Sequence, residues 1–178
     1  KDLAKLVEDG KKKFQGAELS KKTLGVIGMG AIGYRVANLA VELGMEVVGY
    51  DPAMTVNNAW QVSSDVEQVT NIDEVLKRSD FVTIHVPLLE ATRGLIDQQK
   101  LAKMKRDATL LNFSRDAIVD EKALIVSLDS GKLGKYVTDF PNATTKDHQD
   151  VIALPHLGAS TQEAEDECAV MAAQQLKD

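Results

Sequence analysis

Three glycines at a fixed spacing, between a strand-like and a helix-like segment, constrain the fold of this chain more than any other feature. Gly28, Gly30 and Gly33 directly follow the β-branched run Thr23–Ile27 and open a stretch, Ala31–Leu43, whose apolar residues recur at helical spacing. In such a strand–turn–helix unit the first glycine permits a tight turn, the second lets a pyrophosphate approach the backbone, and the third allows close helix–strand packing. The pattern therefore predicts a dinucleotide-binding turn.

The rest of the chain alternates short β-branched runs with longer helical stretches, which is typical of an α/β fold. We predict a doubly wound parallel sheet of the Rossmann type, with helices on both faces, and one hydrophobic core in 178 residues. Helices are expected at Ala31–Leu43, Asp73–Lys77 and Asp120–Ser130, the last beginning after Asp120 as N-cap. The expected strands are Thr23–Ile27, Glu46–Tyr50, Phe81–His85, Thr109–Phe113, Tyr136–Asp139 and Val151–Ala153.

An acid at the end of the second predicted strand supports the dinucleotide interpretation. Asp51 lies at about the 20-residue offset expected of the carboxylate that accepts hydrogen bonds from the adenosine ribose. Its negative charge would repel a 2′-phosphate, so the sequence favours NAD over NADP. In the alternative interpretation no ligand binds here: the glycines only form a turn, and Asp51, which Pro52 follows, only ends a strand.

Composition excludes several classes of partner and site. The net charge of −6 disfavours binding to a phosphate backbone, and no apolar run approaches the roughly 20 residues of a membrane span. Cys168 is the single cysteine, so neither an internal disulfide nor a cysteine-based zinc site is expected. We expect a cytoplasmic protein without nucleic-acid or membrane partners. His148 with its acidic neighbours lacks a second ligand pair, so no metal site is predicted either.

Five segments, in their order and spacing, closely resemble the D-isomer-specific 2-hydroxyacid dehydrogenases. The stretch His156–Thr161, followed by Glu163, Ala164 and Glu165, looks most like the phosphoglycerate dehydrogenase branch of that family, as does the segment Tyr136–Pro141. The five segments are Lys22–Gly28, His85–Leu88, Asn112–Arg115, Ile118–Glu121 and Pro155–Thr161.

The resemblance implies how the chain is organised and what it does. Residues 1–178 resemble the family's NAD-binding domain with a linking helix at each end, Lys1–Lys13 and Glu163–Asp178, so that the substrate lobe lies outside this chain and the chain is a fragment of a two-domain enzyme. It also implies a homodimer and NAD-dependent oxidation of a D-2-hydroxy acid, 3-phosphoglycerate in the branch named. Two alternatives stay open: another small-molecule 2-hydroxy acid of the glycerate or glyoxylate type, and an NAD-responsive binding module like the corepressors that share this fold.

Two residues match the catalytic positions of the family. His156, after Pro155, matches the acid–base histidine of the family. An imidazole suits this role because it can take or return a proton near neutral pH. Arg115 matches the arginine that holds the substrate carboxylate through parallel hydrogen bonds. The matched cofactor contacts are Ala31 and Ile32 for the pyrophosphate, Val86 and Pro87 for the adenosine side, Phe113, Ser114, Gly158 and Ala159 for the nicotinamide end, and Asp139 for the nicotinamide amide.

One departure from the family concerns the partner of the histidine. The family places a glutamate in the loop after the strand bearing Asp139, where it orients the ring, but residues 140–145 contain no acid. Asp147, Asp150 and Glu163 are alternatives between which the spacing does not decide. His85 and His148 are expected to be a packing histidine and a solvated one, and Trp60 is expected to cover the sheet.

Overall fold

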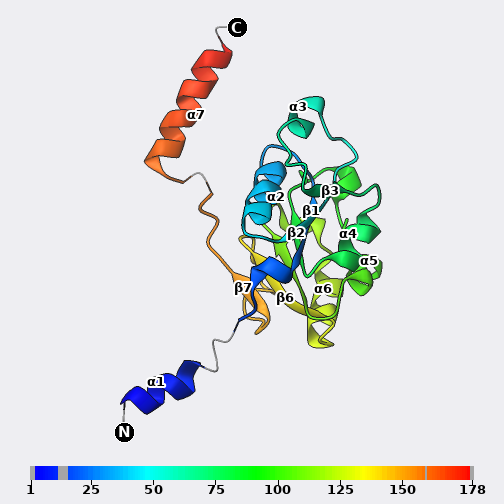
Figure 1. The fold of residues 1–178 in the computed structure, drawn as a ribbon, viewed down its shortest axis with the longest axis vertical. Helices are drawn as coiled ribbons and strands as arrows, with labels where there is room; N and C mark the ends of the chain where they lie inside the picture. The colour runs from blue at the N-terminus through cyan, green and yellow to red at the C-terminus, as the bar shows by residue number, and fades with distance from the viewer. Residues whose placement is uncertain (1–2, 12–15, 159, 177–178) are drawn as a thin grey trace.

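A seven-stranded parallel sheet forms the centre of the molecule. The computed structural model describes residues 3–11, 16–158 and 160–176. The strand order is β3-β2-β1-β4-β5-β6-β7, which confirms the doubly wound parallel sheet (Figure 1). The strands are β1 (Thr23–Ile27), β2 (Glu46–Tyr50), β3 (Val66–Gln68), β4 (Phe81–Ile84), β5 (Ala108–Asn112), β6 (Leu133–Thr138) and β7 (Val151–Ala153).

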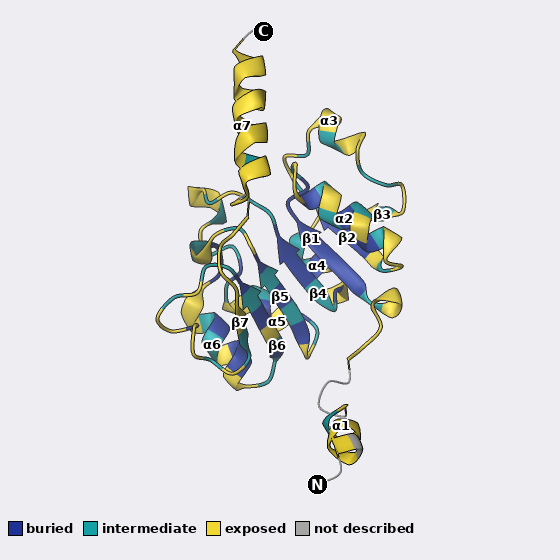
Figure 2. Ribbon diagram, turned by 90° about the vertical axis from the view of Figure 1, so that its left-hand side faces the viewer, coloured by how far each residue is buried: buried dark blue, intermediate teal, exposed yellow. Residues whose placement is uncertain are grey.

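Helices pack on both faces of this sheet because its central strands are apolar on both sides. In β1, Leu24 and Val26 join the apolar cluster under one helix layer, while Ile27 joins the cluster under the other. The first layer contains α2 (Gly33–Glu42), and the second contains α4 (Ile72–Arg78), α5 (Gln98–Lys103) and α6 (Glu121–Asp129). The short α3 (Val56–Ala59) has no buried residue. Figure 2 shows the buried sheet between these layers.

Local signals explain where several helices begin and end. The Asp120 carboxylate accepts a hydrogen bond from the backbone N–H of Ala123 at 2.9 Å, so Asp120 is the N-cap of α6 as expected. Gly44 follows α2 with a φ of +79°, a left-handed conformation in which glycine carries no steric penalty. The sequence pattern did not predict β3, α3 or α5. Trp60 is a correction: it lies at the end of α3 and is 83% exposed, because the short α3 holds it outward instead of over the sheet.

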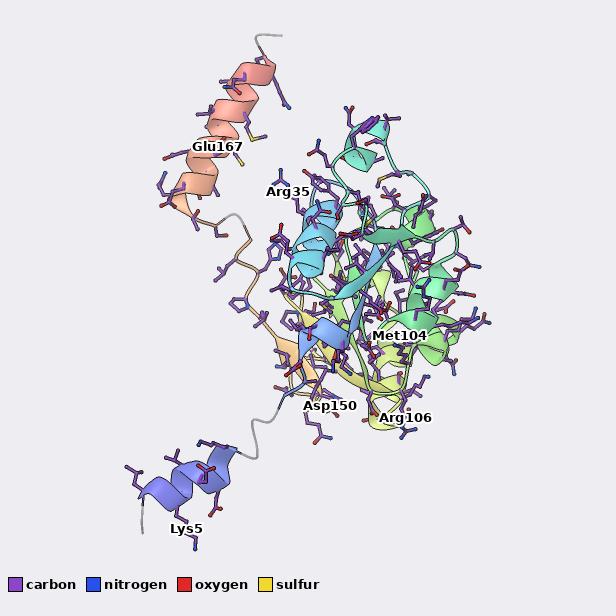
Figure 3. All side chains as sticks on the ribbon, in the orientation of Figure 1. Lys5, Arg35, Met104, Arg106, Asp150 and Glu167 are labelled. Atoms are coloured by element: carbon purple, nitrogen blue, oxygen red, sulfur yellow. The ribbon has the colours of Figure 1, made fainter. Side chains whose placement is uncertain are left out.

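The two terminal helices lie apart from the sheet and its helix layers. Figure 1 shows α1 (Leu3–Lys11) and α7 (Gln162–Gln175) standing away from the body, and Figure 3 places Lys5 and Glu167 on them, far from the sheet. α7 begins at Thr161, whose hydroxyl accepts a hydrogen bond from Ala164 N, and it contains no buried residue. Helix at both ends was expected and is observed. None of the helices in the described ranges has the length and apolarity that crossing a membrane requires.

Candidate functional site

The glycine turn after β1 is closed on one side and open on the other. Gly28 has a φ of +90°, and a Cβ there would lie 2.8 Å from the His85 carbonyl carbon. A Cβ on Gly33 would lie 1.9 Å from the Gly28 carbonyl oxygen, so the first turn of α2 packs directly on the strand end. Gly30 has nothing within 4 Å of its Cβ position. Each glycine therefore meets the steric demand predicted for it, and the empty space lies where a ligand would approach.

Backbone amides at the start of α2 face this space. Ala31 and Ile32 are both exposed, and no protein acceptor within the described chain is recorded for their N–H groups. The first helical bond of this segment runs from Tyr34 N to the Gly30 carbonyl oxygen at 3.2 Å. Free amides and the positive end of the helix dipole favour an anion. The turn therefore fits a pyrophosphate group.

Asp51 lies one residue past β2 and is held beside the glycine turn. One carboxylate oxygen accepts a hydrogen bond from Met29 N and the other from Ala53 N, both at 2.8 Å. Each oxygen can still accept from a sugar hydroxyl, because a carboxylate has about four acceptor positions. The acid is thus next to the turn, where the ribose is expected. It also borders a cleft of about 220 Å³ that is lined by Met29, Gly49, Asp51, Met54, Ala59, Val62, Ser63, Val66 and Gln68.

The loops after β4 and β5 continue the same edge of the sheet. The Ser114 hydroxyl donates a hydrogen bond to the Val86 carbonyl oxygen, which ties the two loops together. Pro87 and Phe113 are exposed beside these two residues. The four residues predicted for the adenosine side and the nicotinamide end therefore come from two loops that touch.

A buried asparagine at the end of β5 fixes the loop that carries Arg115. The Asn112 side chain is fully buried, donates to the Arg115 carbonyl oxygen at 2.9 Å, and accepts from Ser114 N at 3.1 Å. It also donates to the phenol oxygen of Tyr136, whose pKa is raised by burial. The sequence analysis gave Asn112 no role. Its signal was a polar side chain ending a strand that is otherwise apolar.

The guanidinium of Arg115 is exposed at this edge and rests on an aromatic ring. Its central carbon lies 5.2 Å from the ring centroid of Phe140, within the range of a cation–π contact. One guanidinium nitrogen, Nη1, donates to the Ser114 carbonyl oxygen at 2.6 Å. The other N–H groups of the guanidinium donate to no acceptor in the part of the chain that the structure describes, so they can bind a carboxylate.

His156 pairs with a carboxylate that the sequence analysis assigned to another contact. Its Nδ1 lies 2.7 Å from Oδ2 of Asp139, and its ring packs on Phe140 with the centroids 4.4 Å apart. The three alternatives considered were wrong. Asp150 binds the Lys135 ammonium at 2.7 Å, and neither Asp147 nor Glu163 contacts the histidine in the part of the chain that the structure describes.

The second oxygen of Asp139 is buried without a partner. The side chain is only 12% exposed, and its Oδ1 is one of two buried side-chain nitrogen or oxygen atoms in the described residues that form no hydrogen bond. A buried carboxylate oxygen without a donor is costly, so a site of this kind favours a ligand that brings an N–H group. A nicotinamide amide has such a group. Gly158 is exposed in the turn beyond His156, and Ala159 lies outside the described residues.

The other two histidines differ from one another. His85 is partly buried against the glycine turn, with its Nε2 2.9 Å from the Thr83 hydroxyl, which fits the expected packing role. His148 is a correction, because its side chain is only 14% exposed and its Nε2 lies 3.2 Å from Asp129. It accepts a hydrogen bond from Asp150 N and is therefore a structural residue of its loop. No group of three acidic, cysteine or histidine side chains within the described ranges could hold a metal ion.

We expect the stability of the protein to depend on His85 in mildly acidic solution. Burial lowers the pKa of the His85 imidazole below its ordinary value of 6.5, so the unfolded chain binds the proton first as the pH falls. The stability contributed by neutral His85 is present above about pH 6.5 and is lost as the pH falls towards the pKa of the folded state. Urea unfolding of the parent and of His85→Gln across this window will show a steeper loss in the parent. Parallel pH profiles would contradict this expectation.

Comparison with known proteins identifies the family. The family model described as D-isomer specific 2-hydroxyacid dehydrogenase, NAD binding domain, matches residues 2–158. D-3-phosphoglycerate dehydrogenase of Methanocaldococcus jannaschii is 42% identical to the chain over 173 residues, which cover 94% of this chain and 33% of that protein. The chain spans about a third of the length of the curated relatives it matches.

Solved structures agree with this match at the level of the whole chain. D-2-hydroxyisocaproate dehydrogenase has a TM-score of 0.82 at 26% identity, covering 98% of this chain and 58% of that one. D-lactate dehydrogenase from Aquifex aeolicus, complexed with NAD and lactic acid, has a TM-score of 0.76 at 27% identity, covering 98% of this chain and 60% of that one. The glycine turn, the acid beside it and the parallel sheet are shared features of such a domain. The chain therefore belongs to the D-isomer specific 2-hydroxyacid dehydrogenases and contains their NAD-binding domain.

Proposed function

We propose that this domain is part of an NAD-dependent dehydrogenase that oxidises 3-phosphoglycerate to 3-phosphohydroxypyruvate at its CH–OH group. One observation carries the proposal: a guanidinium, Arg115, and a carboxylate–imidazole pair, Asp139 and His156, lie at the same sheet edge as the glycine turn and share one aromatic ring. The choice of 3-phosphoglycerate is supported by curated relatives that are named D-3-phosphoglycerate dehydrogenase. Solved structures named for lactate and hydroxyisocaproate define the competing substrates.

The residues divide the work of the reaction between them. NAD, when bound, supplies the nicotinamide carbon that accepts the hydride. Arg115 binds the substrate carboxylate with two parallel N–H groups, which also orients the hydroxyl-bearing carbon. His156 takes the hydroxyl proton on Nε2, because its Nδ1 faces Asp139 at 2.7 Å. In the reverse direction, as the carbonyl carbon regains the hydride, His156 returns that proton to the substrate oxygen.

The same edge supports NAD rather than NADP. Asp51 lies beside the glycine turn with both oxygens already directed at backbone N–H groups. A sugar hydroxyl can donate to this carboxylate, whereas a 2′-phosphate would place two negative charges in contact. We therefore expect discrimination against NADP through Asp51.

The complete protein has further proposed properties that rest on its relatives and on exposed surfaces. We propose that the complete protein has two domains, and that residues 1–178 are the NAD-binding domain with its linking helices. The chain covers about 33% of the length of its relatives, which leaves room for a second domain. A homodimer is proposed because α2 and the residues at its two ends expose apolar side chains that need cover: Ile32, Leu39 and Leu43 are 66%, 59% and 61% exposed. The single exposed cysteine fits the reducing cytoplasm as its location.

Turnover by the complete enzyme tests the proposal. We expect the highest kcat/KM with 3-phosphoglycerate and NAD. Replacing NAD with NADP should lower kcat/KM about tenfold or more, and so should replacing 3-phosphoglycerate with lactate or glycerate, or with glyoxylate in the direction of reduction. NADH absorbance measures each reaction. A higher kcat/KM with another 2-hydroxy acid would reassign the substrate and leave the dehydrogenase intact. NAD binding without any turnover would instead support a nucleotide-responsive binding module.

A further inference from the structure

We propose that Asp139, the residue that the family resemblance assigns to the nicotinamide amide, also positions the imidazole of His156 in this enzyme, in place of an acid from the loop at 140–145. The inference rests on the proposed function, since it explains how the acid–base histidine of that function is oriented. In it, Oδ2 of Asp139 serves the histidine and Oδ1 serves the cofactor. One side chain would then link NAD binding to the orientation of the acid–base group.

No other carboxylate in the described ranges competes for His156. Residues 140–145 contain no acid, although this loop leaves the sheet directly beside the histidine. Asp150 is bound to the ammonium of Lys135, and Asp147 is exposed near Lys146. The contact between His156 and Asp139 is therefore the pairing that the fold itself supplies.

The two partners are fixed by one buried residue at the end of β6. Thr138 is fully buried, and its hydroxyl accepts a hydrogen bond from Phe140 N at 3.1 Å. Its carbonyl oxygen accepts from Leu154 N at 2.9 Å, just past β7. Asp139 and His156 thus leave two neighbouring parallel strands from a common anchor. Asp139 directly follows β6 and His156 lies three residues past β7, so the hydrogen bonds of Thr138 tie the two segments that carry them to the sheet.

The hydrogen bond determines which nitrogen of His156 reacts. A carboxylate only accepts, so the Nδ1 that faces Asp139 carries the proton in neutral His156. Nε2 then has a free lone pair for the substrate hydroxyl. An imidazole without this partner would divide between two tautomers, one of which cannot act as the base.

Phe140 adds a second constraint on the same ring. It packs against the His156 imidazole with centroids 4.4 Å apart and an interplanar angle of 43°, while the guanidinium of Arg115 lies 5.2 Å from its centroid. One aromatic side chain therefore supports both the proton-transfer group and the carboxylate-binding group. Because Phe140 directly follows Asp139, a single backbone segment orients the whole pair.

The unpartnered oxygen of Asp139 explains why the carboxylate can serve two groups. Oδ1 is buried and accepts no hydrogen bond from the described residues, whereas Oδ2 is already used by the histidine. The amide N–H₂ of nicotinamide could donate a hydrogen bond to Oδ1 without displacing His156 from Oδ2. Occupation of the site by NAD then favours the aspartate position that also holds the imidazole.

Asp139→Asn in the complete enzyme tests the inference. The amide N–H₂ can face Nδ1 and stabilise the unproductive tautomer, so we expect kcat to fall at least about 100-fold while KM for the hydroxy acid changes less than about fivefold. The pH dependence of kcat will change as well, which a purely structural defect would not cause. Phe140→Leu keeps the carboxylate and should lower kcat by a smaller factor. Asp150→Asn, which removes a carboxylate bound to Lys135 instead, is the matched control and should retain parent kcat.

Three outcomes separate the inference from the proposed function. If Asp139→Asn keeps kcat within about threefold while His156→Asn abolishes turnover, Asp139 does not position the histidine and the dehydrogenase assignment stands. If both variants keep turnover, the proposed function itself fails. Should Asp139→Asn not fold, ¹⁵N NMR of the parent with labelled histidine decides: a neutral His156 protonated on Nδ1 supports the inference, and one protonated on Nε2 overturns it.

Discussion

Replacing His156 with asparagine in the complete enzyme is expected to lower kcat by about 10³-fold, because general acid–base catalysis by a positioned side chain contributes about 10²–10⁴. The histidine is half exposed, and its ring packs on Phe140 beside Asp139, so folding should be preserved. NAD binding should weaken only slightly, since the glycine turn and Asp51 are untouched. Steady-state kinetics and calorimetric titration with NAD measure the two effects separately.

His148→Asn is the control for that experiment. His148 lies in the loop between β6 and β7 and pairs with Asp129 at the end of α6, away from the nucleotide-binding edge. Its substitution should therefore leave kcat unchanged. Equal losses of kcat in both variants would indicate a general defect instead of a missing acid–base group. Full activity of the His156 variant would remove this residue from the mechanism.

The second large effect is expected at Gly33. A Cβ there would lie 1.9 Å from the Gly28 carbonyl oxygen, and a backbone atom cannot move aside as a flexible side chain can. Gly33→Ala should therefore lower the free energy of unfolding by about 3 kcal/mol, at the upper end of ordinary overpacking, and abolish measurable NAD binding. Denaturant unfolding and calorimetry give the two quantities.

Gly30→Ala provides the contrasting result from the same turn. Its Cβ would meet no atom within 4 Å, so the stability of the protein should stay at the parent value. The added methyl group would occupy space needed by the pyrophosphate, and we expect the affinity for NAD to fall about tenfold or more. A stable Gly30 variant with parent affinity would show that the phosphates bind elsewhere.

The fold was largely predictable because its strongest signals are local. The apolar runs at β1, β2 and β7 were assigned with their observed bounds, since each is short, apolar and followed by a turn or loop; β1 and most of β2 are buried, whereas β7 is a half-exposed edge strand. β3 was missed because only one of its three residues, Val66, is apolar, whereas the equally short edge strand β7 is apolar throughout. α3 and α5 were missed because helices of four and six residues are too short to show an apolar period.

The site was predictable in its members but not in its pairings. Position at the end of a predicted strand marked Asp51, whereas Arg115 and His156 were identified by their match to the family's catalytic positions. The contact between Asp139 and His156 joins residues 17 apart, and it depends on how β6 and β7 pair. Periodicity contains no information on that register, so the partner of the histidine could be found only from coordinates.

The hydrogen bond from Met29 N to Asp51 has a thermodynamic consequence. It fastens the loop between β1 and α2 to the tip of β2 within the protein itself, so a dinucleotide meets a receptor whose shape already exists. Little chain entropy is then lost on association, and recognition of the phosphates can proceed without a slow ordering step.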